Sequence, residues 1–102
     1  MSIDSDQLQE SIRLAKARAE QLQFSFSAES NLKDRVQCIW LERDGFFCEI
    51  FIFLDSEFVD FSILSDGDQL EFDGPLDQSV TVSEKVSVIL KYLERTVVEN
   101  QT

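Results

Sequence analysis

Three consecutive segments rich in β-forming residues, separated by two short turns, constrain the fold of this chain more than any other feature. They span residues 35–43, 46–54 and 57–64 and consist mainly of branched and aromatic side chains, which favour a pleated, half-buried surface. Asp44-Gly45 is a strong signal for a two-residue hairpin of type I′, because glycine tolerates a positive φ. Asp55-Ser56 can turn the chain a second time. The sequence therefore predicts an antiparallel meander.

Shorter segments extend this meander on both sides. Residues 24–27 alternate apolar and polar side chains, as a half-buried strand does. Residues 69–72 can form a short edge strand. The polar residues 29–33 are expected to form a loop, and residues 65–68 to end the third strand of the meander.

Helical periodicity flanks the strands at both ends of the chain. Residues 5–23 and 83–98 each carry apolar side chains at spacings of three and four, which places them on one helix face. Ser83 is the expected N-cap of the second helix. The order of one helix, four or five antiparallel strands and a second helix is that of an α+β domain, in which both helices commonly pack on one sheet face. A chain of 102 residues suits one modest domain, residues 1–102.

The two turns determine which side chains share a face of the sheet. They place Leu41 opposite Cys48, and Ile50 opposite Phe61. One face is then almost wholly aliphatic and can receive the helices: Ile39, Leu41, Cys48, Ile50, Ile52, Val59, Phe61 and Ile63. The other face mixes aromatic residues with carboxylates: Val36, Cys38, Trp40, Phe47, Glu49, Phe51, Phe53, Phe58, Asp60 and Ser62. Two helices cannot cover both faces, so the aromatic face is expected to be open or closed by a partner.

Negative charge is concentrated in the middle of the sequence. The formal net charge is −11, from 20 Asp and Glu against 9 Lys and Arg. Eleven carboxylates and no basic residue lie between Asp44 and Glu84, whereas the rest of the chain has nine residues of each sign. A surface of that sign repels nucleic acid and anionic membranes and attracts basic protein surfaces. We therefore expect a protein partner with a basic surface, and no nucleic acid or membrane.

The sequence lacks the residues that several kinds of catalytic and metal-binding site require. The chain has no His, which removes His-based nucleophile pairs and zinc sites. Cys38 and Cys48 form no CxxC motif and fall on opposite faces, so no disulfide or thiolate metal site is expected between them. Residues 66–71 begin like a calcium-binding EF-hand loop but fail at its fifth position and at its glycine. Glu49 and Asp60 could act as paired glycosidase carboxylates, but no cleft-forming insertion accompanies them. We expect a non-enzymatic protein without metal or cofactor.

The N-terminal residues and the cysteine content bear on localisation. The N-terminus has neither the basic nor the apolar region of a signal peptide, and no apolar run approaches the roughly 20 residues of a membrane span. Two cysteines without a secretion signal are expected to be reduced thiols. These features predict a cytoplasmic protein.

One family shares this layout. The shared features are an N-terminal helix, the residues LQFSFS at 22–27, the strand-rich block RVQCIWLERDGFFCEIFIFLDSEFVDF at 35–61, and a final helix. In order, length and pattern the chain resembles, over nearly its full length, the small immunity proteins of bacterial polymorphic toxin systems, and in particular the TriTu-type proteins that accompany Rhs-borne ADP-ribosyltransferase toxins. That family favours a Trp in the second meander strand, whereas Trp40 lies in the strand before it. The resemblance implies a cytoplasmic protein that binds and blocks one cognate toxin, and it implies no catalytic residues.

The residues expected to bind the partner form two sets. Carboxylates that can pair with Arg or Lys of the toxin are Glu49, Asp55, Glu57, Asp60, Asp66 and Asp68. Aromatic side chains that can act as anchors are Trp40, Phe47, Phe51, Phe53 and Phe58. Acidic groups speed association with a basic cleft, and buried aromatic anchors slow dissociation. The alternative is that the chain's own loops or a second copy cover this face. We expect a monomer in the complex, or a weak homodimer.

Two other classes of binding protein fit the same composition. A small acidic secretion or folding chaperone would bind extended client segments along the sheet and would usually be a dimer. An acidic nucleic-acid mimic would space its carboxylates like phosphates and carry fewer aromatic residues among them.

Overall fold

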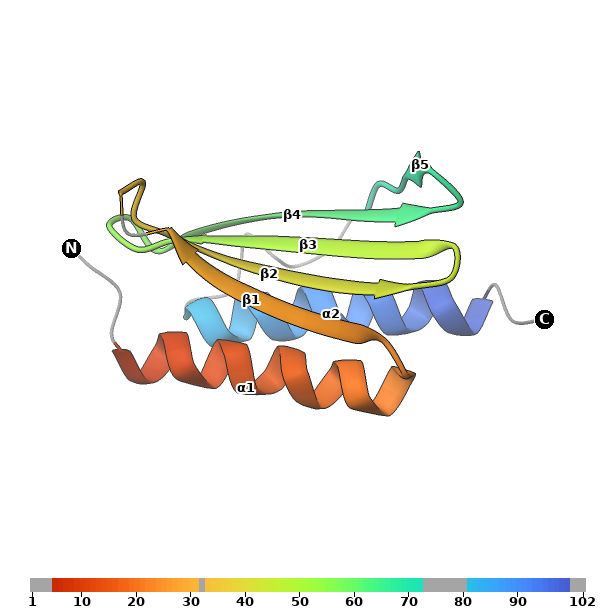
Figure 1. Cartoon of the computed structure of the whole chain (residues 1–102), viewed down its shortest axis with the longest axis horizontal. Helices are drawn as coiled ribbons and strands as arrows, with labels where there is room; N and C mark the ends of the chain where they lie inside the picture. The colour runs from red at the N-terminus through yellow and green to blue at the C-terminus, as the bar shows by residue number, and fades with distance from the viewer. Residues whose placement is uncertain (1–4, 32, 73–80, 100–102) are drawn as a thin grey trace.

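A five-stranded antiparallel sheet with two helices on one of its faces makes up the structure, a computed structural model that describes residues 5–31, 33–72 and 81–99 (Figure 1). The elements are α1 (Ser5–Leu22), β1 (Ser25–Asn31), β2 (Val36–Arg43), β3 (Phe46–Phe53), β4 (Phe58–Ser65), β5 (Asp68–Gln69) and α2 (Val82–Glu99). The strands follow one another across the sheet in sequence order. α1 packs against β1 and β2, and α2 packs against β3 and β4. The predicted α+β fold, with both helices on one face, is therefore confirmed.

The register of the meander is the one that the sequence predicts. Leu41 pairs with Cys48 across β2 and β3, and Ile50 pairs with Phe61 across β3 and β4. The turns that set this register differ in detail. Residues 54–57 form a loop of four rather than two residues, and the Phe53 carbonyl accepts hydrogen bonds from two of its N–H groups, at 3.3 and 3.1 Å. The predicted two-residue loop and the observed four-residue loop are both centred between Asp55 and Ser56, so the pairing of β3 with β4 is unchanged.

The hairpin turn at Asp44-Gly45 is not of type I′, and a type I′ turn occurs instead between β4 and β5. At Asp44-Gly45, φ is positive for Gly45 (82°) but not for Asp44, whereas a type I′ turn needs positive values at both central residues. Asp66 and Gly67, with φ of 51° and 87°, meet that requirement and join β4 to β5. Residues 65–68 therefore end β4, as predicted, and they do so in a second tight hairpin.

The outermost strands differ from the sequence prediction in length. β1 continues through residues 29–31, which were expected to form a loop, and pairs with β2 along all seven of its residues. An edge strand is held by its backbone ladder, so exposed polar side chains do not prevent it from forming. β5 on the opposite edge has only two residues, fewer than the predicted segment 69–72.

Local backbone motifs fix the end of α1 and the start of α2. Gln23 adopts a left-handed φ of 63°, and the next N–H, from Phe24, donates to the Ala19 carbonyl at 2.8 Å, as in a Schellman C-cap. At α2 the N-cap is Thr81, not the predicted Ser83. The Thr81 hydroxyl accepts from the Glu84 N–H at 3.2 Å, and the Glu84 carboxylate accepts from the Thr81 N–H at 3.4 Å, which is a capping box.

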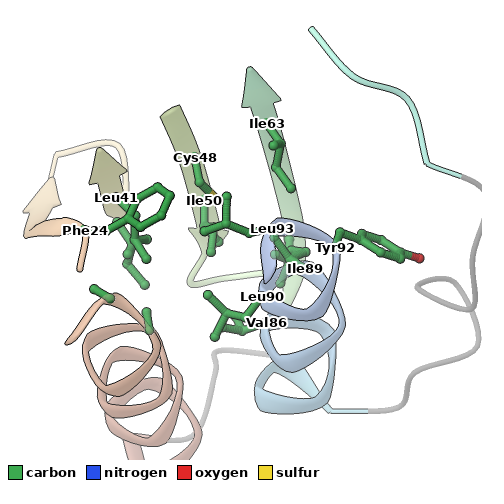
Figure 2. Close-up of a cluster of buried hydrophobic side chains, with 14 of the residues drawn as sticks. Phe24, Leu41, Cys48, Ile50, Ile63, Val86, Ile89, Leu90, Tyr92 and Leu93 are labelled. Carbon is green, nitrogen blue, oxygen red and sulfur yellow. The ribbon is translucent and has the colours of Figure 1, made fainter. Parts of the chain in front are cut away.

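The core lies between the helices and the aliphatic sheet face (Figure 2). All eight residues predicted for that face point toward the helices, and seven are buried. Phe61 lies at the margin of the core, partly covered by Tyr92 at a ring-centroid distance of 6.1 Å. Three polar side chains that the sequence pattern did not place in the core are also buried: Ser11 on α1, Gln37 on β2 and Thr96 on α2.

Candidate functional site

The sheet surface turned away from the helices, called the outer face below, is the site of interest. No described helix or strand lies on it (Figure 1). Strand alternation and register place these residues on it: Ser25, Ser27, Glu29, Asn31, Val36, Cys38, Trp40, Glu42, Phe47, Glu49, Phe51, Phe53, Phe58, Asp60, Ser62, Leu64 and Gln69. It is thus the face that the sequence predicts to be aromatic, and within the described chain it is open.

An aromatic band runs along β3 on the outer face, with Trp40 of β2 and Phe58 of β4 on either side of it. Trp40, Phe47 and Phe51 are half-buried although no element covers them, because large neighbours on a pleated sheet shield one another. Phe53 and Phe58 form a cross-strand pair with centroids 5.7 Å apart, and they are 37% and 57% exposed. The band therefore offers water-accessible aromatic surface that is most exposed at the β3–β4 loop.

Four carboxylates stand on the outer face, and its described residues include no Lys or Arg. Glu49 accepts a hydrogen bond from the Trp40 indole N–H at 2.9 Å. Asp60 accepts one from the Phe61 backbone N–H, also at 2.9 Å. Glu29 and Glu42, which are both exposed, accept no hydrogen bond from any described residue. These two carboxylates can therefore pair with an external cation without first losing an internal partner.

The negative charge belongs to the sheet layer. The two helices carry six basic and six acidic residues and are neutral. Residues 23–72 carry eleven carboxylates and three basic residues, a net charge of −8. The potential of the molecule is consequently asymmetric, and the outer face lies on the negative side.

Seven of the eleven predicted partner-binding residues share the outer face: Trp40, Phe47, Glu49, Phe51, Phe53, Phe58 and Asp60. The other four lie in turns at opposite ends of the sheet. Asp55 and Glu57 are in the β3–β4 loop, and Asp66 and Asp68 are at the β4–β5 turn. Asp55 is held by Arg35, whose Nε lies 2.7 and 2.8 Å from the two carboxylate oxygens. The structure therefore does not gather the predicted carboxylates into one patch.

Sequence reasoning missed Glu29 and Glu42 as members of this site. Glu42 follows Trp40 by two residues on the same strand, so strand alternation alone could have identified it. Glu29 has no such signal, because it lies in a stretch that reads as a loop until pairing with β2 places it beside Cys38.

A hollow of about 500 Å³ adjoins the outer face at the end of the sheet that carries both hairpin turns. The turns lie against each other: the Asp66 N–H donates to the Gly45 carbonyl at 2.7 Å, and a Cβ at Gly45 would lie 2.9 Å from the Asp66 carboxylate. The hollow is lined by Ser25, Glu42, Arg43, Asp44, Gly45, Phe46, Phe47, Leu64, Asp66 and Gly67. Its lining mixes apolar side chains with charged side chains of both signs.

The cysteines show no sign of activation. Burial raises the pKa of the Cys38 thiol, and the charges of Glu29 and Glu49 raise it further. Burial, with a contribution from Glu49, raises the pKa of Cys48 to about 12. Both are free thiols on opposite faces of the sheet. They are protonated at neutral pH and do not supply a thiolate nucleophile.

Within residues 5–31, 33–72 and 81–99, no group of three or more His, Cys, Asp or Glu side chains is placed to hold a metal ion. Neither described helix combines the length and apolar character that crossing a membrane requires. Comparisons with protein-family models, with curated proteins and with solved structures found no match. The outer face is therefore the feature of the described chain that bears most on its function.

Proposed function

We propose that this chain is a binding protein that docks its outer face onto a basic protein surface, and that it acts as an immunity protein neutralising a cognate toxin. One observation carries the proposal: an open sheet face combines an aromatic band with carboxylates and, among its described residues, no basic side chain. Monomeric proteins rarely expose a contiguous apolar patch of this kind unless it binds something.

The two components of the face serve different steps of binding. Negative charge on the sheet layer steers a basic partner toward the face and raises the association rate. Aromatic side chains that lose their remaining contact with water then slow dissociation, the step at which affinity is mostly set. Trp40, Phe53 and Phe58 suit this role because each still has surface to bury.

The resemblance to immunity proteins supports a toxin as the partner. Toxins that act on nucleic acids, nucleotides or NAD bind anionic substrates, so their clefts are often basic. An acidic face can occupy such a cleft by charge complementarity, and it needs no catalytic residue to do so.

A matched pair of neighbouring substitutions tests the outer face. Phe51 and Ile50 are consecutive but point to opposite faces, and Ile50 is fully buried. We expect Phe51→Arg to weaken binding to the product of the neighbouring gene by at least about 100-fold, because a charged side chain would be buried at the interface centre. Its melting temperature should stay within a few degrees of the parent. Ile50→Arg should unfold the protein, since an unpaired core charge costs more than a small domain can lose.

The control adds the same charge on the helix side. Gln9 is exposed on α1, so Gln9→Arg should leave binding unchanged. If Phe51→Arg folds and binds as tightly as Gln9→Arg, the outer face is not the interface and the proposal is wrong. Light scattering on the isolated protein adds a second check, because a stable dimer would favour the chaperone alternative.

A further inference from the structure

The two long edges of the sheet are not equivalent. β1 forms one edge along its full seven residues and contains no Pro, no Lys and no break in its pairing with β2. Natural proteins usually protect an edge of that length, because its unpaired backbone groups can accept another strand. Apart from the single charge of Glu29, the β1 edge carries no such protective feature.

The backbone hydrogen-bond pattern shows which groups of β1 are free. The Leu54 N–H donates to the Arg35 carbonyl at 2.9 Å, so the odd-numbered residues of β2 direct their backbone groups toward β3, and the even-numbered residues direct theirs toward β1. On β1 the partners of those even residues are Ser25, Ser27, Glu29 and Asn31. The N–H and C=O groups of Phe26, Ala28 and Ser30 therefore point away from the sheet, and no described residue bonds to them.

The opposite edge is partly occupied. The outward N–H of Phe61 on β4 donates to the Asp60 carboxylate. Further along, the Ile63 carbonyl accepts from the Leu70 N–H at 2.9 Å, and Ser65 pairs with Asp68 of β5. On β4, Val59 is the one outward residue for which neither backbone group has a described partner. Among the described strands, β1 thus offers the longer and uninterrupted row of unsatisfied backbone groups.

We propose that an extended basic segment of the partner pairs with β1 and continues the sheet as a further strand. This inference rests on the proposed function, because it names how the partner approaches the outer face. Backbone hydrogen bonds to Phe26, Ala28 and Ser30 supply affinity, and the side chains of the added strand that point to the outer face supply specificity. The small, exposed side chains of Ala28 and Ser30 leave the edge accessible.

Charge identifies the occupant as basic. Glu29 on β1 and Glu42 on β2 are the two outer-face carboxylates without a described hydrogen-bond donor, and both lie on the β1 side of the sheet. Arg or Lys at alternate positions of an added strand would lie beside Glu29 and could reach toward Glu42. A second copy of this chain is a poor occupant, because edge-to-edge pairing would bring together two sheet layers that each carry a net charge of −8.

Amide hydrogen exchange on the unmodified protein tests the addition of a strand to β1 directly. The probe is a synthetic peptide of alternating Arg and Thr. We expect exchange at Phe26, Ala28 and Ser30 to slow by at least about tenfold on peptide binding, since each N–H gains an acceptor. Exchange at Ser27 and Glu29 should change little, because those amides already bond to β2. A peptide of alternating Glu and Thr should have no effect. Unchanged exchange with the basic peptide, or equal slowing with the acidic one, would overturn the proposal.

Two substitutions at one position provide the matched variants. Ala28→Pro removes an outward N–H from an edge strand, where proline is tolerated, whereas Ala28→Val keeps that N–H. We expect the proline variant to bind the basic peptide at least about tenfold more weakly, and the valine variant to bind within about threefold of the parent. If the proline variant folds, as judged by circular dichroism, and binds as tightly as the valine variant, strand addition is wrong. If it does not fold, the exchange experiment still decides.

Partner binding by Ala28→Pro and by Phe51→Arg separates this inference from the proposed function. Weakened binding by both variants supports both proposals. Loss with Phe51→Arg alone overturns strand addition and retains the outer face. Loss with Ala28→Pro alone retains strand addition and overturns docking through the aromatic band. If the isolated protein dimerises and Ala28→Pro abolishes the dimer, a second copy is the occupant and the proposal of a basic segment is wrong.

Discussion

At the scale of single residues, Cys48 shows how burial changes the chemistry of a side chain. It lies on β3 with no exposed surface, within the core cluster, and its pKa is about 12 rather than 9.0. Cys38, ten residues earlier on the outer face, has its pKa raised mainly by the same cause. Neither thiol ionises readily, so neither supplies a thiolate at neutral pH.

The raised pKa of Cys48 predicts a loss of stability in alkaline solution. In the unfolded chain the thiol ionises around its ordinary value of 9.0, whereas in the folded protein it stays protonated up to about pH 12. The contribution of the buried, protonated Cys48 thiol to the free energy of unfolding is therefore fully present below pH 9.0 and is lost as pH rises from 9.0 toward 12. The free energy of unfolding should fall by up to about 1.4 kcal/mol per pH unit in that window. Urea unfolding of Cys48→Ala should show a shallower pH slope, and equal slopes would contradict the prediction.

Buried polar residues mark the limit of what the sequence pattern predicts at this scale. Gln37 occupies a core-facing position on β2, where its amide donates to the Cys38 carbonyl at 3.1 Å and accepts from the Ser30 hydroxyl. Ser11 donates to the Gln7 carbonyl at 2.8 Å within its own helix. Hydropathy assigns both residues to the surface. Only the tertiary position of each side chain shows that its hydrogen bonds are satisfied in the interior.

At the scale of elements, the close contact between α1 and α2 depends on small side chains. Ser11 is fully buried one turn after Gln7, whose amide oxygen accepts hydrogen bonds from Ser83 at the start of α2, and Ala15 and Ala19 are buried further along the same face of α1. Ser11→Leu should lower the free energy of unfolding by about 1–3 kcal/mol, because the added volume has no space to enter. Ser11→Ala should change it little, since the hydroxyl bonds only to its own helix. Urea unfolding of both variants distinguishes tight packing from any need for the hydroxyl. A tolerated leucine would show that the helices are not closely packed at this point.

At the same scale, the stability of α2 depends on the capping box at its start. Thr81 and Glu84 satisfy each other's backbone N–H groups, and the helix that follows supplies eight buried residues. Thr81→Ala should therefore cost about 1 kcal/mol of stability, whereas Thr81→Ser, which keeps the capping oxygen, should cost much less. Chemical denaturation of the two variants measures the difference. Equal stabilities would show that another residue caps the helix.

The sequence predicts elements well where side chains bury a face and less well where the backbone alone holds them. The central strands alternate clearly, and their turns fixed the pairing even though the Asp44-Gly45 turn is not of type I′. β1 was predicted too short because residues 29–31 bury little and are held by backbone pairing with β2. The same weakness affects the site, since Glu29 joins the outer face only through that pairing.

At the scale of the whole molecule, the predicted site contains residues that strand alternation placed correctly and residues that were included only for their charge. Alternation predicted the aromatic band, because seven of the predicted residues lie on strands whose register was correct. The four carboxylates in turns were grouped with them by charge alone, and charge along a sequence carries no information about distance in space. Asp55 is an example, because its ion pair with Arg35 makes its carboxylate less available to a basic residue of a partner.

The separation of a neutral helix layer from a sheet layer of net charge −8 predicts opposite effects of salt on stability and on binding. Carboxylates crowded on the sheet side repel one another in the folded state more than in the expanded unfolded chain. Screening shortens the range of that repulsion from about 10 Å at 0.1 M salt to about 3 Å at 1 M. The melting temperature of the isolated protein should therefore rise with sodium chloride, while association with a basic partner should slow. Replacing Glu29 and Glu42 together by Gln should reduce both effects, because these two carboxylates lack a described partner. A melting temperature that falls with salt would show that attractive ion pairs, such as the Arg18–Glu94 bridge between the helices, outweigh the repulsion within the sheet layer.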